Sequence, residues 1–337
     1  MNKDKFITLP EQTRINTFSE SASKKALPPV AVEKDWWVTT VLRALFSLSY
    51  AGNLSFKGGT SLSKCYNVIE RFSEDIDIAV NREYLGFSGT LSKTQIKDKL
   101  RRAACSFVRE TLRFDVEKEL KNQGLSTDLF SIYVNVTPVT TTDPEIIEVV
   151  YQSLFENNDY IKPIVKIEVS GRSMNEPLQT VELKSIVDEA FAGMPFANSP
   201  FEINAVVPER TFWEKVCLLH EEFAKPQELI RTERMSRHLY DLEKMTNTSI
   251  VENALKDRNL YNSIVEHRRT FVELKDFDYD TLATKTIQII PPENIIAQWQ
   301  HDYEVMQQSM IYGESLSFNT LIAKIMQLNE KINQIDW

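Results

Sequence analysis

The chain of 337 residues is poor in cysteine. Its three cysteines, Cys65, Cys105 and Cys217, are odd in number and widely spaced, and no CxxC pair is present. This usage favours reduced thiols in a cytoplasm over a disulfide framework or a cysteine-based zinc site. The 9 glycines and 13 prolines are also too few for a low-complexity chain.

Long hydrophobic runs are missing as well. No apolar stretch approaches the roughly 20 residues that a helix needs to cross a bilayer. The first 21 residues are polar and carry acids, unlike a signal peptide. We therefore expect a soluble, cytoplasmic protein with no membrane partner.

Positive charge is in deficit. The 39 Lys and Arg residues are outnumbered by 48 Asp and Glu residues, which gives a net charge of −9. A large non-specific nucleic-acid surface normally needs an excess of Lys and Arg, so the balance argues against one. It leaves room for a local basic groove, and it fits a basic protein partner equally well.

Familiar catalytic signatures are absent too. The chain has neither the GxxxxGK[ST] phosphate loop nor the GxGxxG dinucleotide loop. Its four histidines accompany no nucleophile elbow, so no hydrolase triad can be argued. Any phosphate chemistry in this chain requires a different phosphate-transfer fold.

What the chain does contain is the periodicity of an α+β protein. Its length exceeds what one core usually serves, and its composition, 42% hydrophobic and 26% charged, is ordinary for a folded protein. Helical spacing predicts helices over residues 10–26, 30–47, 61–69, 92–119, 209–223, 236–247 and 320–335. Strand patterns cover residues 54–57, 75–80, 130–139, 145–151, 161–170 and 286–290. The change of character near residue 205 predicts one domain over 1–205 and a mainly helical one over 206–337.

The first motif is Lys57-Gly58-Gly59-Thr60-Ser61, which ends a predicted strand and opens a helix. A glycine pair alone most often marks a turn. At this position, however, backbone N–H groups and the hydroxyls of Thr60 and Ser61 can point at an anion without steric obstruction. The motif therefore predicts phosphate binding.

The second motif is Asp75-Ile76-Asp77-Ile78. Alternate residues of a strand share a face, so the two carboxylates project together while the isoleucines enter the core. Carboxylates held that close repel each other, and a divalent cation offsets the repulsion. Glu168, in a later strand pattern, is a candidate third ligand, although an outward-facing sheet residue would look the same.

The order of these motifs resembles the nucleotidyltransferase superfamily related to DNA polymerase beta. The fuller spelling, KGGTSLSK followed by ERFSEDIDI, is similar to the AbiEii/AbiGii toxins of abortive-infection and toxin–antitoxin systems. Further segments that resemble the family in the same order are 32–37, 209–215 and 237–242, with a weaker echo at 302–303, 310–313 and Asn333.

The resemblance implies a nucleotidyltransferase-type mixed β-sheet domain flanked by helices, with the helical C-terminal domain completing the active-site cleft. It implies that Mg2+ (or Mn2+) is held by Asp75, Asp77 and Glu168, which are catalytic together with Lys215 and Asp241. The residues expected to bind the NTP are Lys57, Gly58, Gly59, Thr60, Ser61, Arg71, Ser73 and Arg237.

Several of these residues have plainer interpretations. Lys215 could lie along a packed helix face with its ammonium reaching water, and Arg237 with Asp241 could form a surface ion pair worth about 0.3–0.5 kcal/mol. Ser73 is also a candidate for phosphorylation, which would repel an NTP. The segment 33–35 fits either a solvated helix start or a lining of the site.

The function implied is that of a toxin that transfers a nucleotide from an NTP to an acceptor and releases pyrophosphate. The implied acceptor is RNA, such as the tRNA 3′ end. An antitoxin encoded nearby, for which a winged-helix DNA-binding protein is one form, would neutralise it. Two alternatives stay open: transfer to a small molecule or protein side chain, and NTP binding without turnover by an interaction module.

Overall fold

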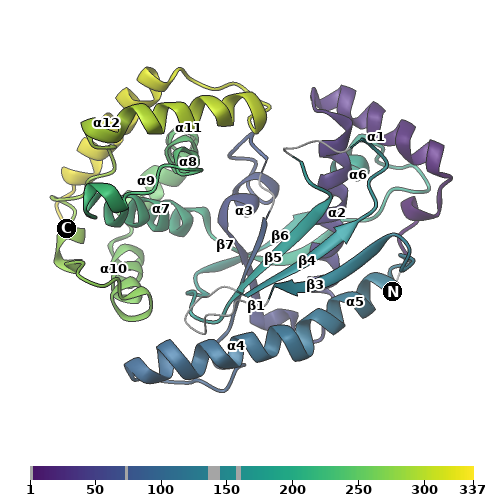
Figure 1. The fold of residues 1–337 in the computed structure, drawn as a ribbon, viewed down its shortest axis with the longest axis horizontal. Helices are drawn as coiled ribbons and strands as arrows, with labels where there is room; N and C mark the ends of the chain where they lie inside the picture. The colour runs from purple at the N-terminus through teal and green to yellow at the C-terminus, as the bar shows by residue number, and fades with distance from the viewer. Residues whose placement is uncertain (1–2, 73–74, 136–144, 157–160) are drawn as a thin grey trace. The chain divides into compact units, whose positions relative to one another are not determined.

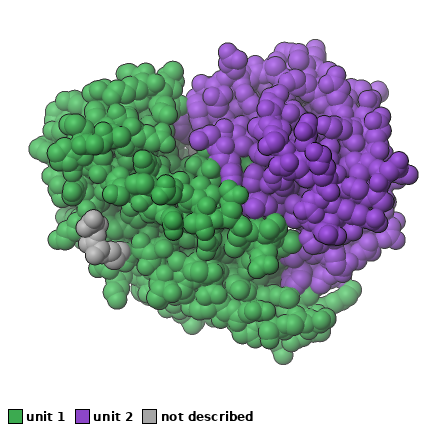
Figure 2. Space-filling model, turned by 180° about the vertical axis from the view of Figure 1, so that it is seen from behind, with its two compact units in different colours: residues 1–65, 73–205 green, residues 66–72, 206–337 purple. Residues whose placement is uncertain are grey.

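A computed structural model describes residues 3–72, 75–135, 145–156 and 161–337. The predicted α+β class is confirmed: a mixed sheet is combined with α-helices. The chain divides into two compact units (Figure 2). Unit 1 comprises residues 1–65 and 73–205, and unit 2 comprises residues 66–72 and 206–337.

The described strands form one sheet of seven, in the order β3-β4-β5-β2-β1-β7-β6 (Figure 1). Their bounds are β1 Leu54–Lys57, β2 Asp75–Val80, β3 Phe130–Asn135, β4 Glu145–Tyr151, β5 Ile164–Ser170, β6 Leu178–Leu183 and β7 Phe201–Val206. β2 pairs antiparallel with β1 and parallel with β5, so the sheet is mixed. The acidic strand β2 occupies the centre of the sheet, where its position is fixed from both sides.

The alternation seen in the sequence separates the two faces of this sheet. Burial alternates residue by residue along β4 and β5 and over the first half of β2. Ile76, Ile78, Ile147 and Ile167 are fully buried on one face. Burying such side chains is worth about 1.5–3 kcal/mol each. The opposite face is only partly covered, and it carries the acids.

The described α-helices of unit 1 are α1 Glu11–Lys25, α2 Pro29–Phe46, α3 Gly58–Lys64, α4 Arg101–Phe107, α5 Arg113–Asn122 and α6 Ile186–Ala190. All of them except α3 contribute buried residues to the core that includes the apolar face of the sheet. α1 and α6 lie against α2, which also packs on α5 and β5 (Figure 1). Trp36 and Trp37 of α2 are buried in this core.

Two helices of unit 1 differ from their predicted bounds. The predicted helix 61–69 begins earlier and ends earlier, at Lys64, with Asn67 in a left-handed conformation that no helix continues. The long helix predicted over 92–119 is interrupted by π-helical stretches at Gln95–Leu100 and Val108–Leu112.

The charged segment 33–35 is neither solvated nor open to a ligand, because all three residues bind neighbouring elements of unit 1. Glu33 accepts hydrogen bonds from Ser153 Oγ (2.5 Å) and the Leu154 N–H (2.8 Å). The Lys34 ammonium donates to the carbonyls of residues 162 and 164 at the start of β5. Asp35 pairs with Lys64 of α3 and accepts from the N–H of Ile186 (2.8 Å). The segment ties α2 to the elements around it.

Unit 2 is helical. Its α-helices are α7 Pro208–Phe223, α8 Ser236–Thr246, α9 Ser249–Lys256, α10 Arg258–His267, α11 Ile296–Ser309 and α12 Phe318–Asn333. Residues 66–72, which the sequence assigned to the first domain, group with this unit. The reason is a set of contacts: Phe72 N–H donates to Met310 O (2.8 Å), and Tyr312 N–H donates to Glu70 O (3.0 Å).

The strand predicted over 286–290 is wrong. The segment forms no ladder, because side chains take its N–H groups instead. The N–H groups of residues 287 and 289 donate to the amide oxygens of Asn333 and Asn329 (2.9 Å each). The N–H of Gln288 donates to His220 Nδ1 (3.0 Å). His220 therefore caps this segment through its ring nitrogen.

Candidate functional site

The open face of the unit 1 sheet brings three predicted metal ligands onto adjacent strands. Asp75 and Asp77 lie two residues apart on β2. In the parallel register, Asp77 stands beside Glu168 of β5, and Asp75 stands beside Lys166. All four side chains are half-buried. The outcome is a polar strip in which each β2 acid has a charged neighbour across the ladder.

This strip suits a hard divalent cation in one specific way. Among the described residues, Asp75 Oδ1 is buried without a hydrogen-bond partner. A buried carboxylate oxygen left in that state costs free energy unless a ligand satisfies it. Within the same described part of the chain, no three His, Cys, Asp or Glu side chains gather as a self-sufficient metal cage. Mg2+ is usually held by one or two carboxylates plus substrate phosphates, so the acids fit such an ion.

Gly58 makes room for Asp77. Antiparallel pairing sets Lys57, the last residue of β1, opposite Asp77. Gly58 follows with φ of +80°, and a Cβ there would stand 2.0 Å from Asp77 Oδ2. No side chain fits that space, and the left-handed backbone disfavours one independently. The glycine is therefore required by the carboxylate.

The hydroxyls expected to reach phosphate are used inside unit 1. Thr60 Oγ1 donates to Asp75 O (2.6 Å), and Ser61 Oγ donates to Gly58 O (2.9 Å). Thr60 thereby ties α3 to the first residue of β2. In this motif, therefore, the groups that could donate hydrogen bonds to a phosphate are the backbone N–H groups at the start of α3. Ser73, the candidate modification target, lies outside the described residues.

Unit 2 holds the other predicted catalytic residues in one buried cluster. Arg71 donates from Nε and Nη2 to the two oxygens of Asp241 (2.7 and 2.8 Å). Lys215 of α7 pairs with Asp241 Oδ2 (2.8 Å). Asp241 is fully buried, and Arg71 and Lys215 are 3% and 7% exposed. The interpretation of Asp241 as a surface ion-pair partner is therefore wrong.

The electrostatics of this cluster favour an ionised Asp241. Burial alone raises the pKa of its carboxyl, but the charges of Arg71 and Lys215 outweigh burial and hold the pKa well below its usual range. Burial, aided by the charge of Arg71, lowers the pKa of Lys215 against the pull of Asp241. Two cations thus share one anion.

His238 is a member of this cluster that the sequence pattern does not reveal. Its Nδ1 lies 3.4 Å from Lys215 Nζ. Burial and the charges of Lys215 and Arg237 lower the pKa of His238 well below its ordinary value, so the ring is neutral at pH 7. The neutral ring can accept a hydrogen bond from the lysine ammonium through Nδ1. The one sequence signal was its position, three residues before Asp241 on the same helix face.

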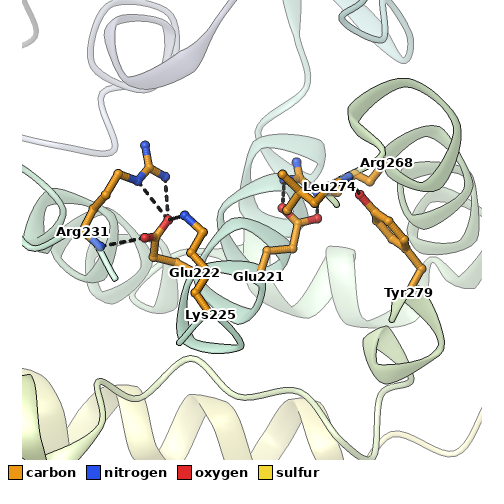
Figure 3. Close-up of polar contacts among 7 residues, drawn as sticks. All are labelled: Glu221, Glu222, Lys225, Arg231, Arg268, Leu274 and Tyr279. Atoms are coloured by element: carbon orange, nitrogen blue, oxygen red, sulfur yellow. Dashed lines mark hydrogen bonds and ion pairs between the residues drawn. The ribbon is translucent and has the colours of Figure 1, made fainter. Parts of the chain in front are cut away.

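Two further acids of α7 serve the fold of unit 2 (Figure 3). Glu221 pairs with both arms of the Arg268 guanidinium. Glu222 accepts from the Arg231 guanidinium (2.7 and 3.0 Å), from the Arg231 N–H (2.8 Å) and from Lys225 (2.8 Å). Burial raises the pKa of Glu222, but these donors outweigh it and the pKa falls. The two acids anchor the end of the helix that carries Lys215.

Comparison with known proteins matches these observations to a family. The sequence model described as nucleotidyl transferase AbiEii toxin, type IV toxin–antitoxin system, matches residues 40–324. No curated protein matches the chain. Among solved structures, the crystal structure of JHP933 from Helicobacter pylori is similar over 90% of this chain and 92% of that chain. The two share 13% identity with a TM-score of 0.43.

Proposed function

The chain belongs to the AbiEii family of type IV nucleotidyl transferase toxins, and from that premise we propose that it transfers a nucleotide from an NTP to an acceptor hydroxyl with release of pyrophosphate. The observation that carries this proposal is the acid pair of β2. Asp75 and Asp77 share the open face, and Gly58 leaves space over Asp77. Asp75 Oδ1 is buried without a hydrogen-bond partner in the described residues.

Asp75 and Asp77 would hold Mg2+ or Mn2+, with Glu168 beside Asp77. When bound, such an ion would neutralise triphosphate charge and favour ionisation of the attacking hydroxyl. The backbone of Gly58 and Gly59 would receive phosphate oxygens. Thr60 would support them by fixing α3 to the start of β2.

In unit 2, Asp241 would act by positioning two cations. It accepts two bonds from Arg71 and one from Lys215, so it fixes the positions of both side chains. Its negative charge also offsets the cost of burying their positive charges. The cluster carries one more positive than negative charge, and such an excess favours a phosphate group. The roles predicted for Lys215, Arg71 and Arg237 toward the triphosphate stay predictions.

The proposed acceptor is RNA, such as the tRNA 3′ end, and the family implies an antitoxin partner. RNA binding should weaken steeply with salt, because each phosphate contact releases counterions. Salt-insensitive binding, or none, would count against RNA. The net charge of −9 favours the second candidate, transfer to a small molecule or to a protein side chain.

The decisive assay incubates the protein with each labelled NTP, Mg2+, and either total RNA or a cell extract. The variants are Asp75→Asn and Asp77→Asn, and the exposed Asp276→Asn is the matched control. We expect label in RNA with the wild type and the control, and a loss of at least 100-fold with either β2 variant. Label in protein or small molecules would establish the second candidate. Equal transfer by all variants would refute the acid pair as the catalytic centre.

A further inference from the structure

A small polar pocket of about 110 Å3 lies in unit 1 and shares no residue with the sites above. It is lined by Lys3, Asp4, Lys5, Arg43, Gln123, Ala197, Asn198 and Ser199. All but one of these side chains are polar. They come from the N-terminal segment, from α2, from the end of α5 and from the loop before β7.

Gln123 is the residue that needs an explanation. Its side chain is 2% exposed, yet neither Nε2 nor Oε1 has a hydrogen-bond partner among the described residues. A buried polar group left without a hydrogen-bond partner destabilises the folded protein. The backbone holds the residue in place, since its N–H donates to Glu119 O (3.0 Å) and its carbonyl accepts from Asp4 N–H (2.8 Å). A buried amide that lines a cavity and uses neither end needs a partner in that cavity, either ordered water or a ligand.

The charges around the pocket specify the sign of that ligand. The lining carries three basic residues, Lys3, Lys5 and Arg43, and one acid, Asp4. A second acid outside the lining, Asp188, also acts on Arg43 and Asp4, so the basic residues remain in excess by one. Both Asp4 oxygens already accept bonds, from the Ile7 N–H (3.1 Å) and from Asn198 Nδ2 (3.0 Å). Arg43 donates one hydrogen bond, from Nη2 to Ser199 O (3.0 Å). The positive excess and the remaining donors favour an anion over a cation.

We propose that this pocket binds a small oxyanion, a phosphate group in size and charge. A water molecule occupies about 30 Å3 of the liquid, so the pocket has room for a tetrahedral anion. The phosphate could be free, or it could be the terminal group of a nucleotide or RNA strand. Gln123 Nε2 and Arg43 would donate to it, and Gln123 Oε1 would accept from its protonated oxygen.

The test uses the full chain carrying Asp75→Asn and Asp77→Asn, with EDTA, so that nucleotide binding at the β2 acids is not counted. Inorganic phosphate is titrated by calorimetry, and thermal unfolding is followed against chloride at equal ionic strength. We expect one saturable site and a rise in Tm on the order of 5 °C at 100 times Kd. Phosphate also stabilises proteins without a site, so saturation is the required result.

The informative variant is Gln123→Leu. It removes two unsatisfied atoms, so without phosphate its Tm should equal or exceed that of the parent, while saturable phosphate binding should be lost. If Gln123→Leu fails to fold, Lys5→Gln replaces it in the test. This exposed substitution should weaken phosphate binding several-fold. The exposed Gln334→Leu serves as control.

The same titration is repeated with a nucleoside monophosphate and with a 5′-phosphorylated oligoribonucleotide. Comparing their binding with that of inorganic phosphate identifies the source of the phosphate group. Absence of a saturable site in the parent would mean that water alone fills the pocket, and it would overturn the proposal. Equal binding by the parent and Gln123→Leu would overturn it too. Either failure leaves the nucleotide-transfer assay unaffected, because the two experiments use separate readouts.

Discussion

At the scale of single residues, Gly58 shows how one atom can decide a site. Gly58→Ala places a Cβ against Asp77 Oδ2 and forces a left-handed alanine, which by itself costs about 1–2 kcal/mol. We expect the carboxylate to be displaced and nucleotide transfer to fall at least 10-fold, measured with labelled NTP. Gly52→Ala is the control, because a Cβ there meets nothing within 4 Å. Equal activity of the two variants would contradict the assignment.

Asp241 illustrates the asymmetry of buried ion pairs. Asp241→Asn leaves Arg71 and Lys215 buried without their counter-charge, which should cost about 3–5 kcal/mol of unfolding free energy in urea. Asp280→Asn removes the exposed partner of Arg269 and should cost at most about 1 kcal/mol. Similar losses in both variants would mean that the cluster has no special role in unit 2.

Asp4 gives a pH dependence with a definite sign. Burial, with the charge of Asp188, raises its pKa from 3.8 to about 6, against the opposing effects of Arg43 and two hydrogen bonds. The folded state therefore binds this proton more tightly than the unfolded state, so stability falls as pH rises from about 4 to about 6. The shift corresponds to about 3 kcal/mol.

The measurement is the unfolding free energy of the wild type and of Asp4→Asn at several pH values across that window. The variant cannot ionise at position 4, so its stability relative to the wild type should grow with pH. Parallel curves for the two proteins would show that Asp4 titrates normally.

At the scale of elements, segment 286–290 pairs its backbone N–H groups with side chains instead of with a neighbouring strand. Asn329→Ala leaves the buried N–H of Ile289 without its acceptor, which should cost about 1–3 kcal/mol. Hydrogen exchange at Ile289 should accelerate in this variant, while the exposed Asn16→Ala should leave it unchanged. An unaffected exchange rate would indicate that water replaces the asparagine.

The elements that sequence reasoning predicted well are those whose pattern is local. The β2 rhythm of acid and isoleucine predicted one face correctly, because period-2 alternation survives wherever one side is buried. β6 was missed, since half of its residues are exposed and their burial does not alternate. The strand predicted over 286–290 failed because its asparagine partners come from α12, which no local pattern reveals.

The candidate site divides in the same way. The shared face of Asp75 and Asp77 was predictable from their spacing on one strand. The close approach of Gly58 to Asp77 was not, because it depends on how β1 pairs with β2. The bond between Arg71 and Asp241 was not, because 170 residues separate them. His238 was missed because its role depends on Lys215 of another helix. Residues that act through distant partners leave no signature in a single sequence.

At the scale of the whole molecule, unit 2 is assembled from two separate parts of the chain. Residues 66–72 supply Arg71, a bridge to Ile311 and the Tyr66 hydroxyl bond to Val206 O (2.8 Å). A fragment of residues 206–337 lacks them all and leaves Asp241 with Lys215 alone. We expect it to be much less stable than the same fragment joined to residues 66–72 by a Gly/Ser linker.

Thermal melting followed by circular dichroism compares the two fragments, with the linked fragment carrying Arg71→Ala as control. If the segment acts through its guanidinium, the control should lose most of the gain, since a lone buried partner costs about 3–5 kcal/mol. If the backbone pairing of residues 70–72 supplies most of the stabilisation, the control should melt at nearly the same temperature as the linked fragment. Equal melting of all three fragments would show that unit 2 does not need this segment, and would remove Arg71 from the cluster that positions Lys215.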